Sequence, residues 1–531
     1  MQARLPKTRA VAAAVPGAAG DARYPWYVLF VLVLVYVLNF LDRQILSILA
    51  EHIKADLQLS DAQIGFLYGT AFAVFYALFG IPLGRLADVW DRRRLISLGL
   101  LAWSAMTAVS GLARSFAQLA AARVGVGIGE SSASPAAFSL LSDYFPINKR
   151  ATALAIYSSG IYIGAGLGLG IGGVIVDRWD AGWVGTTAPW ALKGWQVAFF
   201  AVGLPGALLS VWVRSLREPM RGQADGIVAA AEPHPFRAAF RELRAVLPPF
   251  TLLHLWLERA GRRALAINVA SAAGVAAAAT VLTYWLGTPL QWISLGVGVY
   301  AAVSWAQSLG RRDPVSVDLI LRTPSLRYAV LGFALLAFSG YGIGFWTPPF
   351  FMRVHGIDAG HAGLILGGTA AAGGWLGATL GGVLADRWRL TTANGRLYVA
   401  MLTATLPVPI AVWMLTTASI TLAYVLNFPL ALAAALWLGP AVSTTQDLVL
   451  PRMRATASAA YLLVITFIGL ALGPYVIGRL SVAFASLRLA MIAGLSANLL
   501  ACGLLLAATR HLARDEASKL ERARAAGEMN L

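Results

Sequence analysis

Long apolar runs dominate this sequence and set the strongest limit on its fold. Only 13% of the residues are charged, about half the share in a typical soluble protein. Windows of about 20 residues, the length that crosses a bilayer as a helix, give fourteen candidate spans. They lie at residues 26–50, 62–83, 94–114, 116–141, 150–176, 194–213, 264–286, 290–309, 328–352, 360–384, 397–417, 419–441, 455–478 and 485–508. The sequence therefore predicts an all-α polytopic membrane protein.

The net charge of +17 is concentrated on alternate loops. Arg92, Arg93 and Arg94 follow the second span, and further basic groups follow the fourth and sixth spans. The segment EHIKADLQLSDAQ, between the first two spans, is net acidic. This positive-inside pattern predicts that both termini are cytoplasmic. It also argues against nucleic acid as the partner of the basic groups.

The two ends of the chain are polar. Residues 1–24 lack an apolar core of their own, so we expect a disordered cytoplasmic arm and not a signal peptide. Residues 510–531 are polar and mixed in charge, which predicts a cytoplasmic tail. The single cysteine, Cys502, excludes an intrachain disulfide and a cysteine-based metal site, and we expect it to be buried. We expect no metal, no cofactor and a monomer.

The chain contains an internal repeat. GRLAD at Gly84–Asp88 returns as GVLAD at Gly382–Asp386, an offset of 298 residues. RATALAIY at Arg150–Tyr157 returns as RATASAAY at Arg454–Tyr461, an offset of 304 residues. The two matches agree in register, which indicates that one six-helix half is duplicated in the same orientation. Parallel halves of this kind are typical of transporters, with the substrate site between them near the midplane.

Several motifs carry a resemblance to a known family. GRLADVWDRRRL resembles the loop 2–3 signature of the major facilitator superfamily, and RVGVGIG and SSGIYIGAGLGLGIGG resemble its fourth- and fifth-helix motifs. With NFLDRQILSIL and KRATALAIYSSG, the set is similar to the Spinster branch, notably its bacterial members. The resemblance is strong over residues 26–217 and looser over 327–508. Val89 and Asp91 depart from the loop signature, which usually has Arg and Gly there.

The resemblance and the repeat divide the chain into two six-helix halves, residues 25–217 and 327–509, with an inter-half segment at 218–326. FRAAFRELRAVLPPFTLLHLWLERAGRR in that segment looks amphipathic and basic, a pattern that can lie on an anionic leaflet. Two uncharged runs within residues 264–309 are flanked by arginines, which predicts a transmembrane hairpin. Some facilitator families have two such helices. A passive filler and a role in regulation or substrate access both remain open.

Four charged residues fall inside spans of the first half: Asp42, Arg43, Arg123 and Glu130. A charge at that depth costs several kcal/mol and usually faces a cavity with a partner. At 1.5 Å per residue, Asp42 and Arg123 lie at similar depths, about 6 and 9 Å from the midplane, and can pair. Glu130 lies near the midplane, on the same helix face as Arg123.

Two interpretations of these charges stay open. In the first, Glu130 takes up and releases a proton during transport, because a carboxylate that exchanges an arginine partner for an apolar environment changes its proton affinity. In the second, the four charges form a static or substrate-contacting network. The Spinster resemblance favours the first, since it implies a fourth-helix carboxylate and a neighbouring arginine at the translocation site.

The same resemblance implies an amphiphilic substrate. Arg43 and Arg123 can bind an anionic headgroup, and SGYGIGFWTPPFF in the second half offers an apolar surface. A lysophospholipid or a sphingolipid-like molecule fits this combination, with small organic or sugar-acid anions and hydrophobic drugs as alternatives. The candidate cavity-lining residues are Asn39, Ser131, Ser134, Tyr341, Phe345 and Trp346.

Further charges lie at the helix ends expected in the cytoplasm. In the superfamily, such residues make ion pairs and helix-end contacts that latch the outward-facing state, and the glycines allow close helix packing. The candidate gate residues are Gly84, Asp88, Arg92, Asp143 and Arg150 in the first half, and Gly382, Asp386, Asp447 and Arg454 in the second.

Other functional classes fit the sequence less well. The six histidines form no HExxH motif and no Ser/His/Asp set that we can place, so we expect no enzyme. A GxxxxGK[ST] phosphate loop is absent from the sequence, which argues against an ATP-driven pump. A channel or lipid scramblase would share the fold class but would not show saturable, proton-dependent flux. We therefore predict a secondary active transporter that works by alternating access, and the Spinster resemblance implies a bacterial inner membrane.

Overall fold

The computed structural model describes residues 23–225 and 233–528, and these residues form helices without strands. Most of the predicted N-terminal arm, residues 1–22, lies outside the described residues, as do residues 529–531 of the tail. The described part of the tail is helical: α23 continues to Ala517 and α24 follows. Cys502 is half-buried, so it is less enclosed than its sequence context predicts.

The helices fall into three consecutive groups. The first group is α1 (Tyr24–Leu57), α2 (Asp61–Tyr68), α3 (Thr70–Val89), α4 (Arg92–Ser110), α5 (Phe116–Glu130), α6 (Ala133–Tyr144), α7 (Ile147–Gly182), the short η1 (Pro189–Ala191) and α8 (Gly194–Arg214). The second group is η2 (Gln223–Asp225), α9 (Pro235–Val246), α10 (Phe250–Leu257), α11 (Arg262–Leu286), α12 (Pro289–Arg312) and α13 (Pro314–Leu321).

The third group follows the same plan as the first. It contains α14 (Pro324–His355), α15 (Ala359–Thr391), α16 (Gly395–Thr405), α17 (Pro407–Thr416), α18 (Ile420–Ala435), α19 (Leu438–Asp447), η3 (Pro451–Met453), α20 (Arg454–Val464), the π-helix η4 (Ile465–Ala471), α21 (Leu472–Phe484), α22 (Leu487–Gly494), α23 (Ser496–Ala517) and α24 (Lys519–Ala525). Both halves interrupt their fourth long helix, between α5 and α6 and between α18 and α19.

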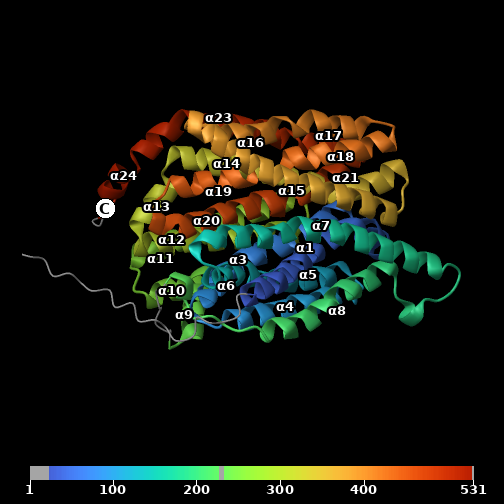
Figure 1. Cartoon of the computed structure of the whole chain (residues 1–531), viewed down its shortest axis with the longest axis horizontal. Coiled ribbons are helices and arrows are strands. Elements are labelled where there is room, and N and C mark those ends of the chain that lie inside the picture. The colour runs from blue at the N-terminus through green and yellow to red at the C-terminus, as the bar shows by residue number, and fades with distance from the viewer. Residues whose placement is uncertain (1–22, 226–232, 529–531) are drawn as a thin grey trace, which may run out of the picture.

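The two six-helix groups lie side by side. Figure 1 shows α1–α8 gathered on one side and α14–α23 on the other, with α7 and α15 where they meet. Glycines make this contact possible: a Cβ on Gly173 would lie 2.1 Å from the carbonyl oxygen of Ala359, and one on Gly363 would lie 2.2 Å from that of Leu169. The glycine-rich fifth span therefore serves helix packing between the halves.

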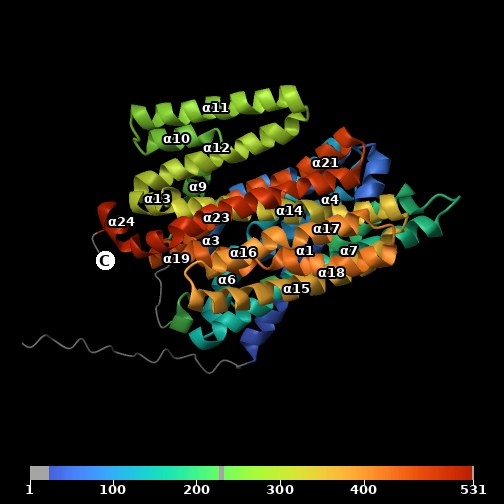
Figure 2. The ribbon, with the colours of Figure 1, turned by 90° about the horizontal axis from the view of Figure 1, so that it is seen from above.

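The inter-half segment stands at the edge of the bundle. Figure 2 shows α11 as the outermost helix, with α12 between it and the rest of the molecule. Asn268 of α11 is fully buried against α12, where it donates to Ser304 Oγ over 3.0 Å and accepts from Tyr300 Oη over 2.6 Å. This polar contact joins two helices that otherwise present apolar side chains outward.

The number of spans is a point where prediction and structure differ in detail. Eleven helices among the described residues are long and apolar enough to cross a membrane. They match eleven of the fourteen predicted segments. The other three segments correspond to α4, which begins with three arginines, to the interrupted pair α5 and α6, and to α12. The all-helical membrane fold is confirmed, and the count of fourteen stays a prediction.

Candidate functional site

The four buried charges of the first half meet as two ion pairs between α1 and α5. The Arg43 Nε atom lies 2.7 Å from Glu130 Oε2, and Arg123 Nη1 lies 3.6 Å from Asp42 Oδ1. Asp42, Arg123 and Glu130 are almost completely buried. The predicted pairing of Asp42 with Arg123 is therefore present, and Arg43 rather than Arg123 holds Glu130.

Aromatic rings and one hydroxyl complete the surroundings of these charges. The Arg43 guanidinium carbon lies 4.5 Å from the ring centroid of Phe72, 4.6 Å from that of Tyr76 and 4.9 Å from that of Phe40. Thr107 Oγ1 of α4 donates to Asp42 Oδ2. Sequence reasoning missed these partners because no motif marks a residue that meets the charge from a distant helix. Cation–π contacts of this kind stabilise a desolvated cation by roughly 2 kcal/mol.

The network is not saturated with hydrogen bonds. Within the described residues, Glu130 Oε1, Asp42 Oδ1 and the Nε and Nη1 atoms of Arg123 are buried without a hydrogen-bond partner. Buried polar atoms are normally satisfied, and each exception requires an explanation. Glu130 therefore has one carboxylate oxygen held by Arg43 and one oxygen available to a proton or to a polar ligand group.

The second half has neutral residues where the first half has this network. Asn427 and Ala434 lie 304 residues after Arg123 and Glu130, the offset that also relates the RATALAIY and RATASAAY repeats. Asn427 Nδ2 donates to Thr369 Oγ1 over 2.7 Å. Asn427 and Ala434 both line a largely apolar cavity between the halves, which we call the inter-half cavity.

That cavity has a volume of about 360 Å³ and lies between α1, α7, α14 and α18. Phe40 and Gln44 of α1 line it from the first half, and Phe40 also contacts Arg43, which links the cavity wall to the charged network. From the second half, Gly340, Tyr341 and Gly344 of α14 line it. The wall is mainly apolar, with isolated polar groups such as Asn427.

Among the predicted cavity-lining residues, Tyr341 lies on the wall and the others do not. Phe345 and Trp346 are fully buried, so their expected exposure to the cavity is wrong. The physical reason is that their face of α14 packs against the first half and α21. The Phe345 ring lies 4.3 Å from that of Tyr68, and Trp346 Nε1 donates to the Pro474 carbonyl over 2.8 Å.

The polar candidates Asn39, Ser131 and Ser134 lie away from the cavity wall. Asn39 is buried on α1, and its Oδ1 atom lacks a hydrogen-bond partner within the described residues. Ser131 donates to the Ile128 carbonyl over 2.8 Å, which caps the interruption between α5 and α6. Ser134 lies half-buried in the first turn of α6. These serines therefore shape the helix break beside Glu130 instead of the cavity.

The Arg92 end of the bundle is held by ion pairs inside the first half. Arg92 is fully buried; its Nη1 atom lies 2.5 Å from Asp143 Oδ2 and its Nε atom 2.7 Å from Glu218 Oε1. Asp88 is exposed and lies 4.0 Å from Arg85 of its own helix. Arg150 lies in the first turn of α7. The predicted latch between states stays a prediction, because the Arg92 contacts join helices of one half.

The second half repeats this arrangement with a residue that the sequence analysis missed. Arg396 at the start of α16 forms an ion pair with Asp447 and lies 3.8 Å from Asp386. Its offset from Arg92 is 304 residues, the same as that of Asp447 from Asp143, which was the available signal. Arg454 is exposed at the start of α20. Its neighbour Arg452 instead pairs with Asp313, over 2.7 Å.

The packing role expected of Gly84 and Gly382 stays a prediction, because neither position lies in a tight contact in this structure. A Cβ on Gly84 would approach only the Pro135 Cβ, at 4.0 Å, and one on Gly382 would meet nothing within 4 Å. The tight contact belongs to Gly381, where a Cβ would lie 2.0 Å from the Leu436 carbonyl oxygen. The repeat motif therefore marks the helix end correctly but not the glycine that lies in the close contact.

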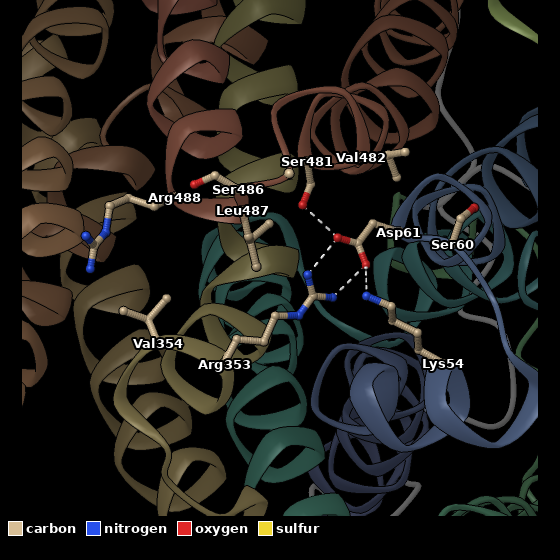
Figure 3. Close-up of a pocket in the computed structure, with 11 residues that line it drawn as sticks. Lys54, Ser60, Asp61, Arg353, Val354, Ser481, Val482, Ser486, Leu487 and Arg488 are labelled. Carbon is tan, nitrogen blue, oxygen red and sulfur yellow. Dashed lines mark hydrogen bonds and ion pairs between the residues drawn. The ribbon is translucent and has the colours of Figure 1, made fainter.

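At the other end of the bundle, ion pairs join the two halves. Arg353 at the end of α14 binds Asp61 of the first half through two nitrogens, at 2.6 and 2.7 Å, and Glu51 at 2.6 Å. Lys54 and Ser481 also contact Asp61, each at 2.7 Å. Figure 3 shows Arg353, Lys54 and Ser481 converging on Asp61, which lines a cavity of about 610 Å³. We call this group the Asp61 cluster.

Sequence reasoning missed the Asp61 cluster because its members look like ordinary loop charges. Asp61 is 4% exposed despite its place at the first residue of α2. The residues come from α1, α2, α14 and α21, so no local pattern links them. Together they link the two halves at this end.

Comparison with known proteins identifies the family. Residues 32–474 match the family model of the Major Facilitator Superfamily, so the chain belongs to this superfamily of transporters, which are not enzymes. A solved structure of a bacterial homologue of the human lysosomal transporter Spinster, inward-facing and occupied, superposes with a TM-score of 0.70 and 27% identity. The match covers 93% of this chain and 99% of that one. The chain is thus a Spinster-like, multi-pass membrane transporter.

Three further proteins are similar to this chain, one over most of its length and two over about a third of it. An MFS-type efflux pump of Mycolicibacterium smegmatis is 28% identical over 86% of this chain and 85% of its own length. Partial matches include the sphingosine-1-phosphate transporter SPNS2 of Danio rerio, 31% identical over 36% of this chain and 35% of that protein. The probable L-galactonate transporter of Escherichia coli is 29% identical over 33% of this chain and 35% of its length.

Proposed function

We propose that this protein moves an amphiphilic anionic or zwitterionic molecule, such as a lysophospholipid or a sphingolipid-like molecule, by proton-coupled alternating access. The observation that carries the proposal is the position of the Arg43–Glu130 pair beside a largely apolar cavity between the halves. A molecule with an ionic head and an apolar tail matches both surfaces. In this proposal Arg43 and Arg123 contact the head, and the wall around Tyr341 contacts the tail.

Proton coupling is assigned to Glu130. One of its oxygens accepts from Arg43 and the other is buried without a hydrogen bond among the described residues. When an anionic head engages Arg43, the carboxylate loses its charged partner. An unpaired buried carboxylate favours the protonated form. Substrate binding and proton uptake are thereby linked at one arginine.

The placement in the membrane follows from the charges of the loops. We propose that the Arg92 end faces the cytoplasm, with both termini there, in a bacterial inner membrane. We retain the domain division into halves at 25–217 and 327–509 and an inter-half segment at 218–326. A monomer is sufficient for the mechanism, since both walls of the cavity come from one chain.

Two other substrate classes have support from similar proteins. Small sugar-acid anions are favoured by the partial similarity to a probable L-galactonate transporter, and would use the two arginines alone. Export of hydrophobic compounds is favoured by the similarity to an MFS-type efflux pump over most of the chain. The large apolar share of the cavity wall supports an amphiphile over a sugar acid.

Flux into proteoliposomes that contain a pH-sensitive dye tests the proposal. A lysophospholipid and a sugar acid are offered in parallel under an imposed proton gradient. We expect saturable lysophospholipid uptake accompanied by proton movement. Proton movement with the sugar acid only would establish the alternative substrate class. Lipid flux without proton movement would remove the coupling role of Glu130.

A further inference from the structure

A second cavity, of about 230 Å³, lies where α9 and α10 meet the end of α12. It shares no residue with the inter-half cavity and lies outside both six-helix halves. Its wall is formed by Arg241, His254, Leu255, Glu258, Ser308, Arg311 and Arg312. Water occupies about 30 Å³ per molecule in the liquid, so this volume accommodates a group of several heavy atoms.

The charge of this wall favours an anion. Arg312 is bound to Glu242 over 2.8 Å and donates to Ser308 Oγ over 3.1 Å, which holds the end of α12 on α9. Arg241 and Arg311 make no ion pair with any residue that the structure describes. Among the described residues of the wall, Glu258 is the one carboxylate. Within this described set, the guanidinium groups of Arg241 and Arg311 therefore outnumber the opposing charge.

His254 gives the cavity a fixed polar group. Its side chain is 6% exposed and has no side-chain hydrogen bond in the described part of the chain, although it lines the cavity. Burial lowers the pKa of His254, while Glu258 opposes this shift. A neutral imidazole can donate one N–H group. Guanidinium groups and a ring N–H match the acceptor oxygens of a phosphate.

The surroundings of the cavity are those of a membrane interface. Phe250, Leu253 and Trp256 of α10 are 41%, 44% and 67% exposed, and the adjoining α11 is long and apolar enough to cross a membrane. Helices with apolar side chains facing outward and arginines at their ends lie at the headgroup level of a bilayer. Figure 2 shows α10 between α11 and α12, at the edge of the bundle. A basic pocket between helices at this level suits a lipid headgroup.

We propose that this cavity binds the phosphate headgroup of an anionic phospholipid of the surrounding bilayer. Arg241 and Arg311 contact the phosphate, His254 donates to it, and the acyl chains lie along α10 and α11. The site thereby anchors the inter-half hairpin to the membrane. The proposal is independent of the transported substrate, because the two cavities are separate.

The test uses the full-length protein in nanodiscs of equimolar phosphatidylglycerol and phosphatidylcholine, or of phosphatidylcholine alone. The readouts are the melting temperature and the phosphatidylglycerol retained after extraction into detergent, measured by native mass spectrometry. We expect phosphatidylglycerol to raise the melting temperature. The double variant Arg241→Gln/Arg311→Gln loses this rise and binds the lipid about 30-fold more weakly, at roughly 1 kcal/mol per arginine.

The matched control is Arg262→Gln/Arg263→Gln, which removes two exposed arginines at the start of α11 that do not line the cavity. We expect this variant to keep the lipid effect. Equal loss in both double variants would overturn the proposal, because it would indicate general attraction to a charged surface. Inorganic phosphate added to phosphatidylcholine nanodiscs distinguishes the source. A melting temperature that rises with free phosphate but not with phosphatidylglycerol would contradict a lipid site.

Discussion

The two halves share ion pairs at their helix ends but differ at matched positions in their interiors. Arg92 pairs with Asp143 in the first half, and Arg396 pairs with Asp447 in the second. At the centre, Arg123 of the first half is matched by Asn427 of the second. One half therefore contributes charges to the centre and the other contributes a neutral wall.

This difference separates the ion pairs that hold each half together from the charges of the candidate site. An ion pair at a helix end serves folding in either half, so a duplicated frame retains it. Buried charges at the centre are costly, and only one half carries them. Removing the second set lowers this cost and leaves an apolar surface opposite the first.

The largest effect is expected for Arg123→Ala. Its removal leaves Asp42 as a buried charge without its partner, which costs about 3 to 5 kcal/mol of folding free energy. Asn427→Ala, at the matched position, loses one hydrogen bond and about 1 kcal/mol. Thermal unfolding in detergent compares the two variants. Equal destabilisation would show that the halves do not differ in this way.

A second comparison concerns the helix-end arginines. Arg92→Ala leaves Asp143 and Glu218 without their partner at a fully buried site. We expect the free energy of unfolding to fall by about 3 kcal/mol. Arg396 lies beside Asp447 and Asp386, whose side chains are 37% and 77% exposed. We therefore expect Arg396→Ala to lower the free energy of unfolding by about 1 kcal/mol. The same unfolding measurement applies. A larger loss for Arg396→Ala would reverse the ranking.

The cavity can be blocked without disturbing the fold. A Cβ on Gly344 meets no atom within 4 Å, and Gly344 lines the cavity, so Gly344→Leu should reduce transport more than about tenfold at unchanged melting temperature. Gly473→Ala is the control. Its Cβ would lie 2.4 Å from the Phe338 carbonyl oxygen, so we expect destabilisation of about 1 to 3 kcal/mol. Full transport by Gly344→Leu would exclude this cavity as the pathway.

The smallest effect is expected at the Asp61 cluster. Arg353→Gln removes the ion pairs to Glu51 and to the buried Asp61, but Lys54 and Ser481 still contact Asp61. We therefore expect a loss of about 1 kcal/mol, which should open this end about fivefold more often. Labelling of Leu487→Cys in a Cys502→Ser background by an impermeant maleimide measures the opening. Arg488 lines the same cavity and makes no ion pair within the described chain, so Arg488→Gln is the control. It should leave the labelling rate unchanged.

Much of this architecture was predictable from the sequence. Apolar length and charge placement predicted the helical membrane fold, and the repeat predicted two halves. The depth of Asp42 and Arg123 along their spans predicted that they pair, because helical rise is fixed per residue. These predictions succeed because each depends on one helix or on one pair of matched segments.

The remaining features depend on how each helix is oriented about its own axis relative to its neighbours. Trp346 was expected on the cavity wall, but its face of α14 turns toward Pro474. Arg353 and Asp61 meet across 292 residues of sequence, and nothing local marks either one. A motif such as GVLAD places Gly382 at a helix end, yet the tight contact falls on its neighbour Gly381. In each case the packing between helices decides the outcome.

The most direct test of the account measures proton-gradient-driven uptake of a lysophospholipid by Glu130→Gln in proteoliposomes, beside exchange of the same lipid without a gradient. Asp318→Asn is the control, because its ion pair with Arg322 lies on the surface. We predict that Glu130→Gln loses gradient-driven uptake and retains exchange, while the control keeps both. Unchanged gradient-driven uptake by Glu130→Gln would contradict the central claim that this buried carboxylate couples protons to transport.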